Sequence, residues 1–439
     1  MQAFSCYIVI AALIFIGPYS ALAELSSTSP SLVMTYKNYH WRQLRLEQDS
    51  SRYRNEWVQA IEANFDSGYI NDLAGIEITA GSATPLDKEN IRRPTNLEQD
   101  QDGDIPSIHG IQQAFIKGRY QLGLWTLEGK YGIRKRRYQL YSNSSSRILD
   151  ASSQGIDLAA NYKNIQIYGA YITGGSNYND GAFTNKLTNS SRVNPQQIDA
   201  ISILGLQYRW NLSNFKLETL YTSDAMAKYF ASVNHQWPLN KTTAITLDGR
   251  MAYARSIGNK LGYDADSDGD GRADYFQTMD DYQSRYYNLN ATLQGEHSYI
   301  GIGYGQTLLD NWISSVVTSG NSGRFNSSLS LWSKYSLKGE QGVVLRFGHN
   351  FEPLGLPELK LSGYTAYGWG AHDYQSNFRR QEWRLQLSYA FSGLLEGLTV
   401  RGQMTNYRQS SQHRDFATST TKLNHKIYRF YLTYTRSLL

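Results

Sequence analysis

The chain of 439 residues has little of several things that folded proteins of this length usually contain. It has 1 Cys and 9 Pro, and its formal net charge is only +5. The lone Cys6 excludes an internal disulfide framework, and so small a net charge gives no indication of nucleic-acid binding. After the first 23 residues there is no apolar run near the roughly 20 residues that a membrane-spanning helix needs. A helical membrane protein is therefore excluded.

Aromatic residues and glycine are abundant instead. The chain contains 34 Tyr, 15 Phe, 9 Trp and 37 Gly, while charged residues make up 18% of it. A chain so rich in aromatic residues and so poor in charge is not disordered. Tyr-rich and Pro-poor composition favours one large β structure.

The first 23 residues read as an export signal. They contain no Asp, Glu, Lys or Arg, and Tyr7–Ile16 forms an apolar core. Ala21-Leu22-Ala23 then gives the small-x-small pattern of a signal-peptidase site. We expect a signal peptide over residues 1–23, cleavage before Glu24, and one transmembrane β-barrel domain over residues 24–439.

From residue 32 onward the dominant hydrophobic period is two. In residues 396–407, for example, apolar side chains alternate with Thr399, Arg401 and Gln403. The segments are about ten residues long, which is the length of a strand that crosses a bilayer at a tilt. Charges on the polar faces suit a water-filled lumen better than a protein surface. The predicted fold class is an all-β, transmembrane, antiparallel β-barrel.

The connections between these segments alternate between short turns and long polar stretches. Transmembrane barrels show this alternation because their periplasmic turns are short and their extracellular loops long. The order is kept only if Leu329–Tyr335 belongs to a loop, which leaves eighteen strands and both termini on the periplasmic side. The final segment, Tyr428–Leu439, would pair with the first strand and close the barrel.

Several short motifs, in this order along the chain, resemble one known family. They are Tyr36-x-Asn38-Tyr39, Glu56-Trp57-x-Gln59, Asn143-Ser144-Ser145-Ser146-Arg147-Ile148-Leu149, Gly355-Leu356-Pro357-Glu358-Leu359 and the closing strand that ends in Ser437-Leu438-Leu439. The chain resembles the OprD-type family of substrate-specific outer-membrane porins, which includes a chitoporin-like branch. The resemblance implies an eighteen-stranded channel for small carboxylates or basic amino acids, guided by a ladder of lumenal arginines.

The match to that ladder is incomplete. Arg147, Arg401, Arg408 and Arg429 stand where many members of the family have Arg, whereas Gln403 replaces a ladder Arg. Lys334 stands where an acidic loop residue is common. The aromatic stretch Tyr364–Trp369 is similar to the branch that passes chito-oligosaccharides, in which aromatic faces form a path for sugar rings.

Period two also assigns charges to the lumenal face. The candidate channel-lining residues are Arg147, Arg250, Arg346, Lys360, Arg384, Arg401, Arg429, Tyr364, Glu62, Glu77, Asp248 and Glu382. We expect a basic arc on the last five strands to face an acidic arc on the early strands, and Asp248 to pair with Arg250. Such an arrangement would orient dipolar solutes. The alternative is that these charges only hydrate the wall and pair with one another.

A run of four basic residues, Arg134–Arg137, opens the third long loop. It could steer anions into the channel mouth. The alternative is contact with lipopolysaccharide phosphates or exposure to solvent.

One loop has the spacing of a calcium site. The candidate ligand residues are Asp266, Asp268, Asp270, Arg272 and Asp274, and Gly271 would permit the sharp turn. Gln277 stands where calcium loops usually carry a bidentate Glu. The alternative is an acidic loop without a metal.

The sequence as a whole favours a passive, partly selective channel for small polar solutes such as carboxylates or amino acids. The alternatives are a chitoporin-like channel, a general porin, a plugged receptor and a barrel enzyme. The eight His are scattered and no catalytic motif is present, so we expect no enzyme and no required cofactor beyond a structural Ca²⁺. The expected partners are outer-membrane lipid, lipopolysaccharide, solutes and the barrel-assembly machinery. The protein would be a monomer or a labile trimer in a Gram-negative outer membrane.

Overall fold

The computed structural model describes most of the chain. The described residues are 30–46, 54–88, 94–100, 102–176, 184, 186–189, 191, 193–265, 274–315, 317, 325, 333–373, 378–410 and 423–439. The predicted signal peptide lies outside them. Within the described residues, no helix is both long enough and apolar enough to cross a membrane.

Eighteen strands form one sheet. They are β1 (Ser31–Arg45), β2 (Arg54–Asp66), β3 (Ala74–Pro85), β4 (Ile108–Leu122), β5 (Trp125–Arg134), β6 (Ser152–Tyr162), β7 (Ile165–Ser176), β10 (Ile201–Trp210), β11 (Ser213–Thr222), β12 (Met226–Pro238), β13 (Ala244–Ser256), β16 (Gln283–Gln294), β17 (Ser298–Leu309), β18 (Gln341–Phe351), β19 (Leu356–Trp369), β20 (Arg379–Ala390), β21 (Leu398–Ser410) and β22 (Leu423–Ser437). Two short hairpins lie in the long connections: β8 (Leu187–Thr188) with β9 (Gln197–Ile198), and β14 (Gly262–Ala265) with β15 (Tyr275–Thr278). Two 3₁₀ turns, Glu352–Leu354 and Gly393–Leu395, cap short connections.

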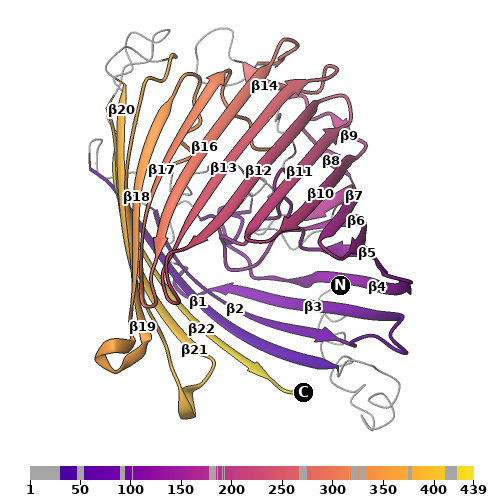
Figure 1. Cartoon of the computed structure of the whole chain (residues 1–439). Coiled ribbons are helices and arrows are strands. Elements are labelled where there is room, and N and C mark those ends of the chain that lie inside the picture. Colours follow the sequence, from indigo (N-terminus) through magenta and orange to yellow (C-terminus); the bar gives the residue numbers. More distant parts are fainter. Residues whose placement is uncertain are drawn as a thin grey trace.

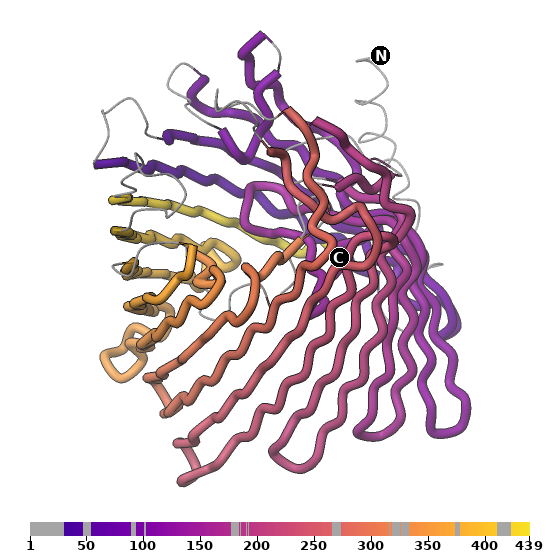
Figure 2. The backbone as a smooth tube through the Cα atoms, turned by 90° about the horizontal axis from the view of Figure 1, so that it is seen from above, coloured from indigo at the N-terminus to yellow at the C-terminus, as the bar shows by residue number. Residues whose placement is uncertain are grey.

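The sheet closes on itself (Figures 1 and 2). Each strand pairs antiparallel with its neighbours, and the last strand, β22, pairs with β1 from His425↔Arg45 to Ser437↔Val33. The predicted barrel of eighteen strands and its closure by the final segment are confirmed. The described part of the doubtful segment, Ser333–Tyr335, lies in the connection between β17 and β18, as predicted.

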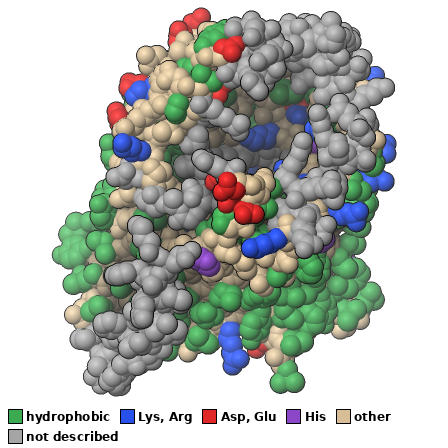
Figure 3. All heavy atoms as spheres, turned by 180° about the vertical axis from the view of Figure 1, so that it is seen from behind, with side chains coloured by type: hydrophobic (Ala, Val, Ile, Leu, Met, Phe, Trp, Pro, Cys, Tyr) green, Lys and Arg blue, Asp and Glu red, His purple; other side chains and the backbone are tan. Residues whose placement is uncertain are grey.

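Alternation along the strands separates a lipid face from a lumenal face. On β2, Ile61 and Trp57 point outward, with exposed fractions of 53% and 43%, whereas Val58 and Ala60 between them are buried inside. Figure 3 shows hydrophobic side chains gathered over the lower outer surface, with Lys and Arg visible in and beside the hollow above it. A barrel with this pattern satisfies its backbone groups in lipid and keeps its charges in the lumen.

The connections are short at one end of the barrel and mostly long at the other. Residues 163–164 and 211–212 are two-residue turns, whereas residues 135–151 and 310–340 are long. One connection on the long side breaks the alternation, because only Ser223–Ala225 joins β11 to β12. The predicted order of short turns and long loops otherwise holds.

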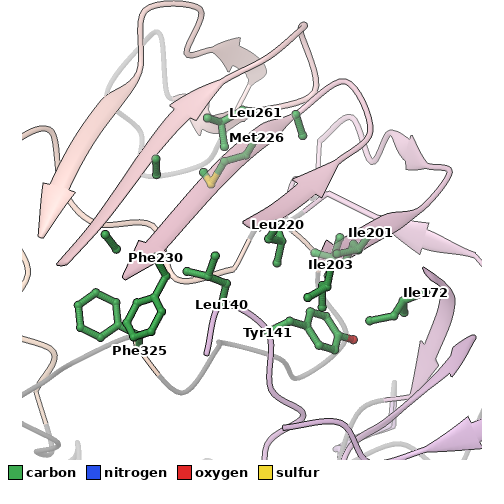
Figure 4. Close-up of a cluster of buried hydrophobic side chains, with 14 of the residues drawn as sticks. Leu140, Tyr141, Ile172, Ile201, Ile203, Leu220, Met226, Phe230, Leu261 and Phe325 are labelled. Carbon is green, nitrogen blue, oxygen red and sulfur yellow. The ribbon is translucent and has the colours of Figure 1, made fainter. Parts of the chain in front are cut away.

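The long connections fill the barrel with a hydrophobic cluster. Leu140 and Tyr141 from one loop and Phe325 from another pack against inward side chains such as Ile203 and Phe230. In Figure 4 the Phe325 and Phe230 rings lie next to each other, and their centroids are 5.0 Å apart with the ring planes tilted by 59°. The Phe325 amide also donates to the Gln139 carbonyl at 2.8 Å, so the two loops meet inside the barrel. The interior is therefore narrowed by its own loops.

Candidate functional site

The segment Lys135–Ala151 lies inside the barrel and is held at two places. At its tip, the amides of Gln139 and Leu140 donate to the Glu218 carboxylate of β11 at 3.1 and 2.6 Å. Further along, the Ile148 amide donates to Asn96 Oδ1 at 2.7 Å. In Figure 2 this segment is the purple tube within the ring of strands. The segment therefore joins β11 to the connection between β3 and β4 and narrows the lumen between them.

The basic run Arg134–Arg137 was expected either to steer anions at the mouth or to contact lipopolysaccharide or solvent, but three of its four residues pair with carboxylates. The Arg136 side chain is fully buried, and its Nη2 lies 2.8 Å from the Asp157 carboxylate on β6. Arg134 also pairs with Asp157, and Lys135 pairs with Asp150. Arg136 holds the loop to β6 because a buried guanidinium needs a paired carboxylate, whereas the Lys135–Asp150 pair lies within the segment itself. Of the four, only Arg137 is exposed.

Tyr138 completes this anchor. Its phenol donates to the Asp157 carboxylate at 2.5 Å, and burial together with that carboxylate raises the pKa of Tyr138. The phenol therefore stays protonated and remains a donor at physiological pH.

The described residues at the end of a second long connection, 333–340, are tied to β20. Arg380 of β20 makes a two-pronged contact with the buried Glu340 carboxylate. Glu382, also on β20, accepts the Ser333 amide at 3.0 Å. Glu382 was predicted to line the channel; it points inward but is 1% exposed and holds the loop.

Arginines gather around aromatic rings at the seam between the first and last strands. The Cζ atoms of Arg429, Arg54 and Arg147 lie 4.1, 4.5 and 5.1 Å from the centroid of the Trp41 ring. Arg401 lies over Tyr431 at 3.9 Å, and Tyr431 stacks on Tyr39 at 4.6 Å. We call Arg54, Arg147, Arg401 and Arg429, with Trp41 and Tyr431, the arginine–aromatic cluster. All four guanidiniums are half-buried.

The remaining predicted basic residues also face the lumen. Register pairs Arg346 with Tyr364 and Tyr364 with Arg384, which places all three on one face of β18, β19 and β20. Arg384 Nε donates to Thr405 Oγ1 at 3.2 Å, and its guanidinium lies 5.0 Å from the Tyr364 ring. Lys360 shares the same face. Among the described residues, no carboxylate forms an ion pair with Arg384, Arg401 or Lys360.

The acidic residues predicted on the other side of the lumen are bonded to neighbouring side chains. Glu62 pairs with Lys37, and Glu77 accepts from Asn64 at 3.1 Å. Asp248 pairs with Arg250 at 2.6 Å, as expected. The acidic side chains therefore point inward and are bonded to other residues of the wall, Glu62 and Asp248 to cations and Glu77 to a neutral amide.

The aromatic stretch on β19 does not form a path for sugar rings. Tyr364 is 8% exposed and its hydroxyl donates to Glu382. Tyr367 and Trp369 have the opposite parity and point outward, where their rings stack at 5.8 Å. The interpretation of this stretch as a sugar track is therefore wrong, because strand alternation sends its side chains to two different faces.

Several residues of the site escaped the sequence reasoning. Arg54 and Trp41 were not selected, although each has the inward parity of its strand. Glu218 and Asp157, which hold the third loop, were missed as well. Inward parity could have selected all four residues, but only the folded loop shows which of them it contacts.

The predicted calcium loop lies mostly outside the described residues. Asp266, Asp268, Asp270 and Arg272 are not among them, and Asp274 is exposed directly before β15. Within the described part of the chain, no group of three His, Cys, Asp or Glu side chains could hold a metal ion.

Comparison with known proteins agrees with the barrel fold. Porin-like protein GalP of Pseudomonas putida is 24% identical to this chain, over 96% of this chain and 95% of GalP. Solved structures with the same fold include OccAB1 of Acinetobacter baumannii (TM-score 0.78, 15% identity, 93% of this chain and 97% of that one) and OpdK of Pseudomonas aeruginosa with vanillate (TM-score 0.73, 17% identity, 93% and 98%).

A family profile described as outer membrane porin, OprD family, matches residues 28–438. That match covers nearly the whole chain and includes every strand of the barrel. A closed barrel of this family implies the outer membrane of a Gram-negative cell. The chain therefore belongs to the OprD family of outer-membrane porins.

Proposed function

We propose that this porin passes small carboxylates and that the arginine–aromatic cluster is its selectivity site. The observation that carries the proposal is the gathering of four half-buried guanidiniums around Trp41 and Tyr431. Arginine binds carboxylates through two parallel hydrogen bonds, and a water-filled, low-dielectric passage strengthens that attraction. The half-buried Tyr431 ring can contact the apolar body of an aromatic acid, whereas Trp41 is buried and positions the guanidiniums.

The partnering of the acidic residues supports the same preference. Glu62 and Asp248 are neutralised by Lys37 and Arg250, whereas Arg401 has no ion-pair partner among the described residues. Glu56, the cross-strand partner of Trp41, adds one negative charge beside the four guanidiniums of the cluster, so the charge there is still in positive excess. The solved structure of OpdK contains vanillate, an aromatic carboxylate, in a protein with the same fold. Passage of neutral oligosaccharides is the competing proposal, and the outward side chains of β19 count against it.

Reversal potentials in a salt gradient test the proposal. We expect the refolded protein in a planar bilayer to prefer anions. The double variant Arg401→Gln with Arg429→Gln should lower the anion-to-cation permeability ratio about fivefold, because two unit charges 4 Å apart in water interact by about 1 kcal/mol. Arg408→Gln with Arg436→Gln is the matched control, because both residues lie on the outward faces of β21 and β22.

Solute block separates the competing substrates. Benzoate, arginine and chito-oligosaccharides are added in turn, and transient current block by benzoate alone is the expected result. Block by chito-oligosaccharides without block by benzoate would overturn the proposal. Mass spectrometry of the exported protein tests the proposed leader, with Glu24 as the expected first residue.

A further inference from the structure

Four cations face the lipid on neighbouring strands near the long-loop end of the barrel. They are Arg379 on β20, Arg408 on β21, Lys426 on β22 and Arg42 on β1, and each has the outward parity of its strand. Among the described residues, no carboxylate forms an ion pair with any of the four. The outward positions of these strands hold no Asp or Glu. The charge that this face presents to the lipid is therefore entirely positive.

The four cations lie at similar heights in the membrane. Lys426 lies opposite Leu44, and Arg42 is the next outward residue on β1; the other neighbouring pairs are offset in the same way. The strand ends step in the same direction, since β1 ends at Arg45, opposite His425 and two residues short of the start of β22. Such a line follows the strand tilt of membrane barrels. Diagonal neighbours are about 7–8 Å apart, so two of these long side chains can reach one anion.

Outward tryptophans mark this height as a membrane interface. Trp383 lies four residues from Arg379 on β20, and Trp57 lies opposite His40, the outward residue next to Arg42. Aromatic girdles flank the apolar band of a membrane barrel, and charges on the lipid face cost little at that level. The connections at this end are the long, extracellular ones. The cations therefore lie at the headgroups of the outer leaflet.

An apolar groove adjoins the cations on the same outward face. It has a volume of about 570 Å³ and crosses β20, β21, β22 and β1. Leu385, Met404 and Phe430 line it, and Arg42 borders it. The groove is open at Gly402, where an added Cβ would meet no other atom within 4 Å. It therefore has room for a hydrocarbon chain beside a cation.

The position of the groove matches the depth of one leaflet. Gly402 lies six residues from Arg408 on β21, about 20 Å at the usual strand rise. A strand tilt of about 40° reduces this to about 15 Å along the membrane normal. The hydrocarbon core of a bilayer is about 30 Å thick, so the groove reaches from the headgroups to the middle of the bilayer. A chain that lies in it would span the outer leaflet.

We propose that this face binds one lipopolysaccharide molecule, with a phosphate on Arg42 and Lys426 and an acyl chain over Gly402. Phosphate oxygens form strong, charge-assisted hydrogen bonds with Arg and Lys. Lipopolysaccharide is the phosphorylated lipid of the outward leaflet, which is the leaflet at this end of the barrel. The site crosses the seam between β22 and β1, so the bound lipid joins the two strands whose pairing closes the barrel. The inference does not depend on which solute the lumen passes.

Native mass spectrometry of the refolded porin tests the contacts with phosphate. Purified lipopolysaccharide is titrated into the protein in detergent, and we expect one molecule to bind. Arg42→Gln with Lys426→Gln should lower the affinity about thirtyfold, because basic residues at an anionic lipid surface add their contributions. Arg436→Gln with Lys241→Gln is the matched control, since it removes one Arg and one Lys from the short-turn end. It should keep the wild-type affinity.

A second pair of variants tests the groove. Gly402→Phe fills the open space and should lower the affinity about fivefold through lost contacts with the acyl chain. Gly249→Phe is its control, because it fills a groove of about 610 Å³ that has no Arg or Lys in its lining. Heat-dependent mobility in gels confirms that each variant forms the barrel. Lipopolysaccharide should also raise the temperature at which the wild type unfolds, and should raise it less in Arg42→Gln with Lys426→Gln.

Three outcomes would overturn the site. The first is an equal loss of affinity in Arg42→Gln with Lys426→Gln and in its control. The second is binding of dephosphorylated lipopolysaccharide as tightly as the intact form, since the cations would then contribute nothing. The third is equally tight binding of phosphatidylglycerol, which would assign this face to anionic phospholipid.

Discussion

Trp41 and Arg429 are direct cross-strand partners at the seam of the barrel, and the Arg429 guanidinium lies over the Trp41 ring at 4.1 Å. The pair joins the first strand to the last, so the selectivity site we propose is built on the contact that closes the barrel. Arg54 and Arg147 approach the same ring from β2 and from the inserted third loop. One indole therefore connects three parts of the chain that are distant in sequence.

Replacing this indole should weaken the binding of aromatic acids. Trp41→Leu removes the ring that positions three guanidiniums, and a single exposed cation–π contact contributes about 0.5–1 kcal/mol. We expect the affinity for benzoate, measured from current block, to fall about fivefold. Trp57→Leu on the outward face of β2 is the control and should keep wild-type affinity. An equal loss in both variants would assign the effect to general damage of the barrel.

Releasing the tip of the third loop should widen the channel. Glu218→Ala removes the carboxylate that accepts two amides of that loop, and hydrogen bonds to charged groups contribute about 1.5–3 kcal/mol each. We expect a larger single-channel conductance, a noisier current and faster tryptic cleavage after the exposed Arg137. Glu128→Ala makes the same charge change on the wall of β5 without touching the loop, and should resist trypsin like the wild type.

Breaking the buried pair between Arg136 and Asp157 should destabilise the loop strongly. Asp157→Asn leaves the Arg136 guanidinium buried without its carboxylate, which costs about 3–5 kcal/mol. Hydrogen exchange of the segment Lys135–Ala151 should rise, whereas the distant strands of the barrel should keep their protection. Arg136→Met with Asp157→Asn should recover part of the loss. A double variant as unstable as the single one would contradict a pairwise interaction.

The faces of the strands were predictable, because alternation leaves only two choices for each strand. The choice is settled by where the charges fall, as with Arg401 and Arg429 against their apolar neighbours. Closure of the barrel followed for the same reason, since lipid tolerates no unpaired edge. The sequence pattern does not determine which residues face each other on neighbouring strands, so the contact between Trp41 and Arg429 could not be predicted.

The inserted loops were not predictable from local pattern. Arg136 lies in a polar, basic run that reads as solvent-exposed, yet it is buried because Asp157 and Tyr138 meet it in the folded barrel. Leu140 and Tyr141 were a signal of insertion, because two large apolar residues in a polar loop need a surface to cover. Their partners come from strands far along the chain, and only tertiary packing selects them.

The acidic loop between β14 and β15 should bind calcium weakly. The β14–β15 hairpin pairs Ala265 with Tyr275, and the Asp274 amide donates to the Ala265 carbonyl at 2.8 Å, so the two ends of residues 266–274 are held together. Closed ends reduce the entropy that a cation must overcome to order the loop. Extracellular calcium modules bind with dissociation constants of about 0.1–1 mM, and we expect that range in calorimetry of the refolded porin.

Asp268→Asn with Asp270→Asn should abolish the heat of calcium binding. Asp102→Asn with Asp104→Asn, an equally spaced pair in the second long loop, should leave it unchanged. If the whole protein gives no heat at millimolar calcium, the loop holds no metal and its carboxylates are simply solvated.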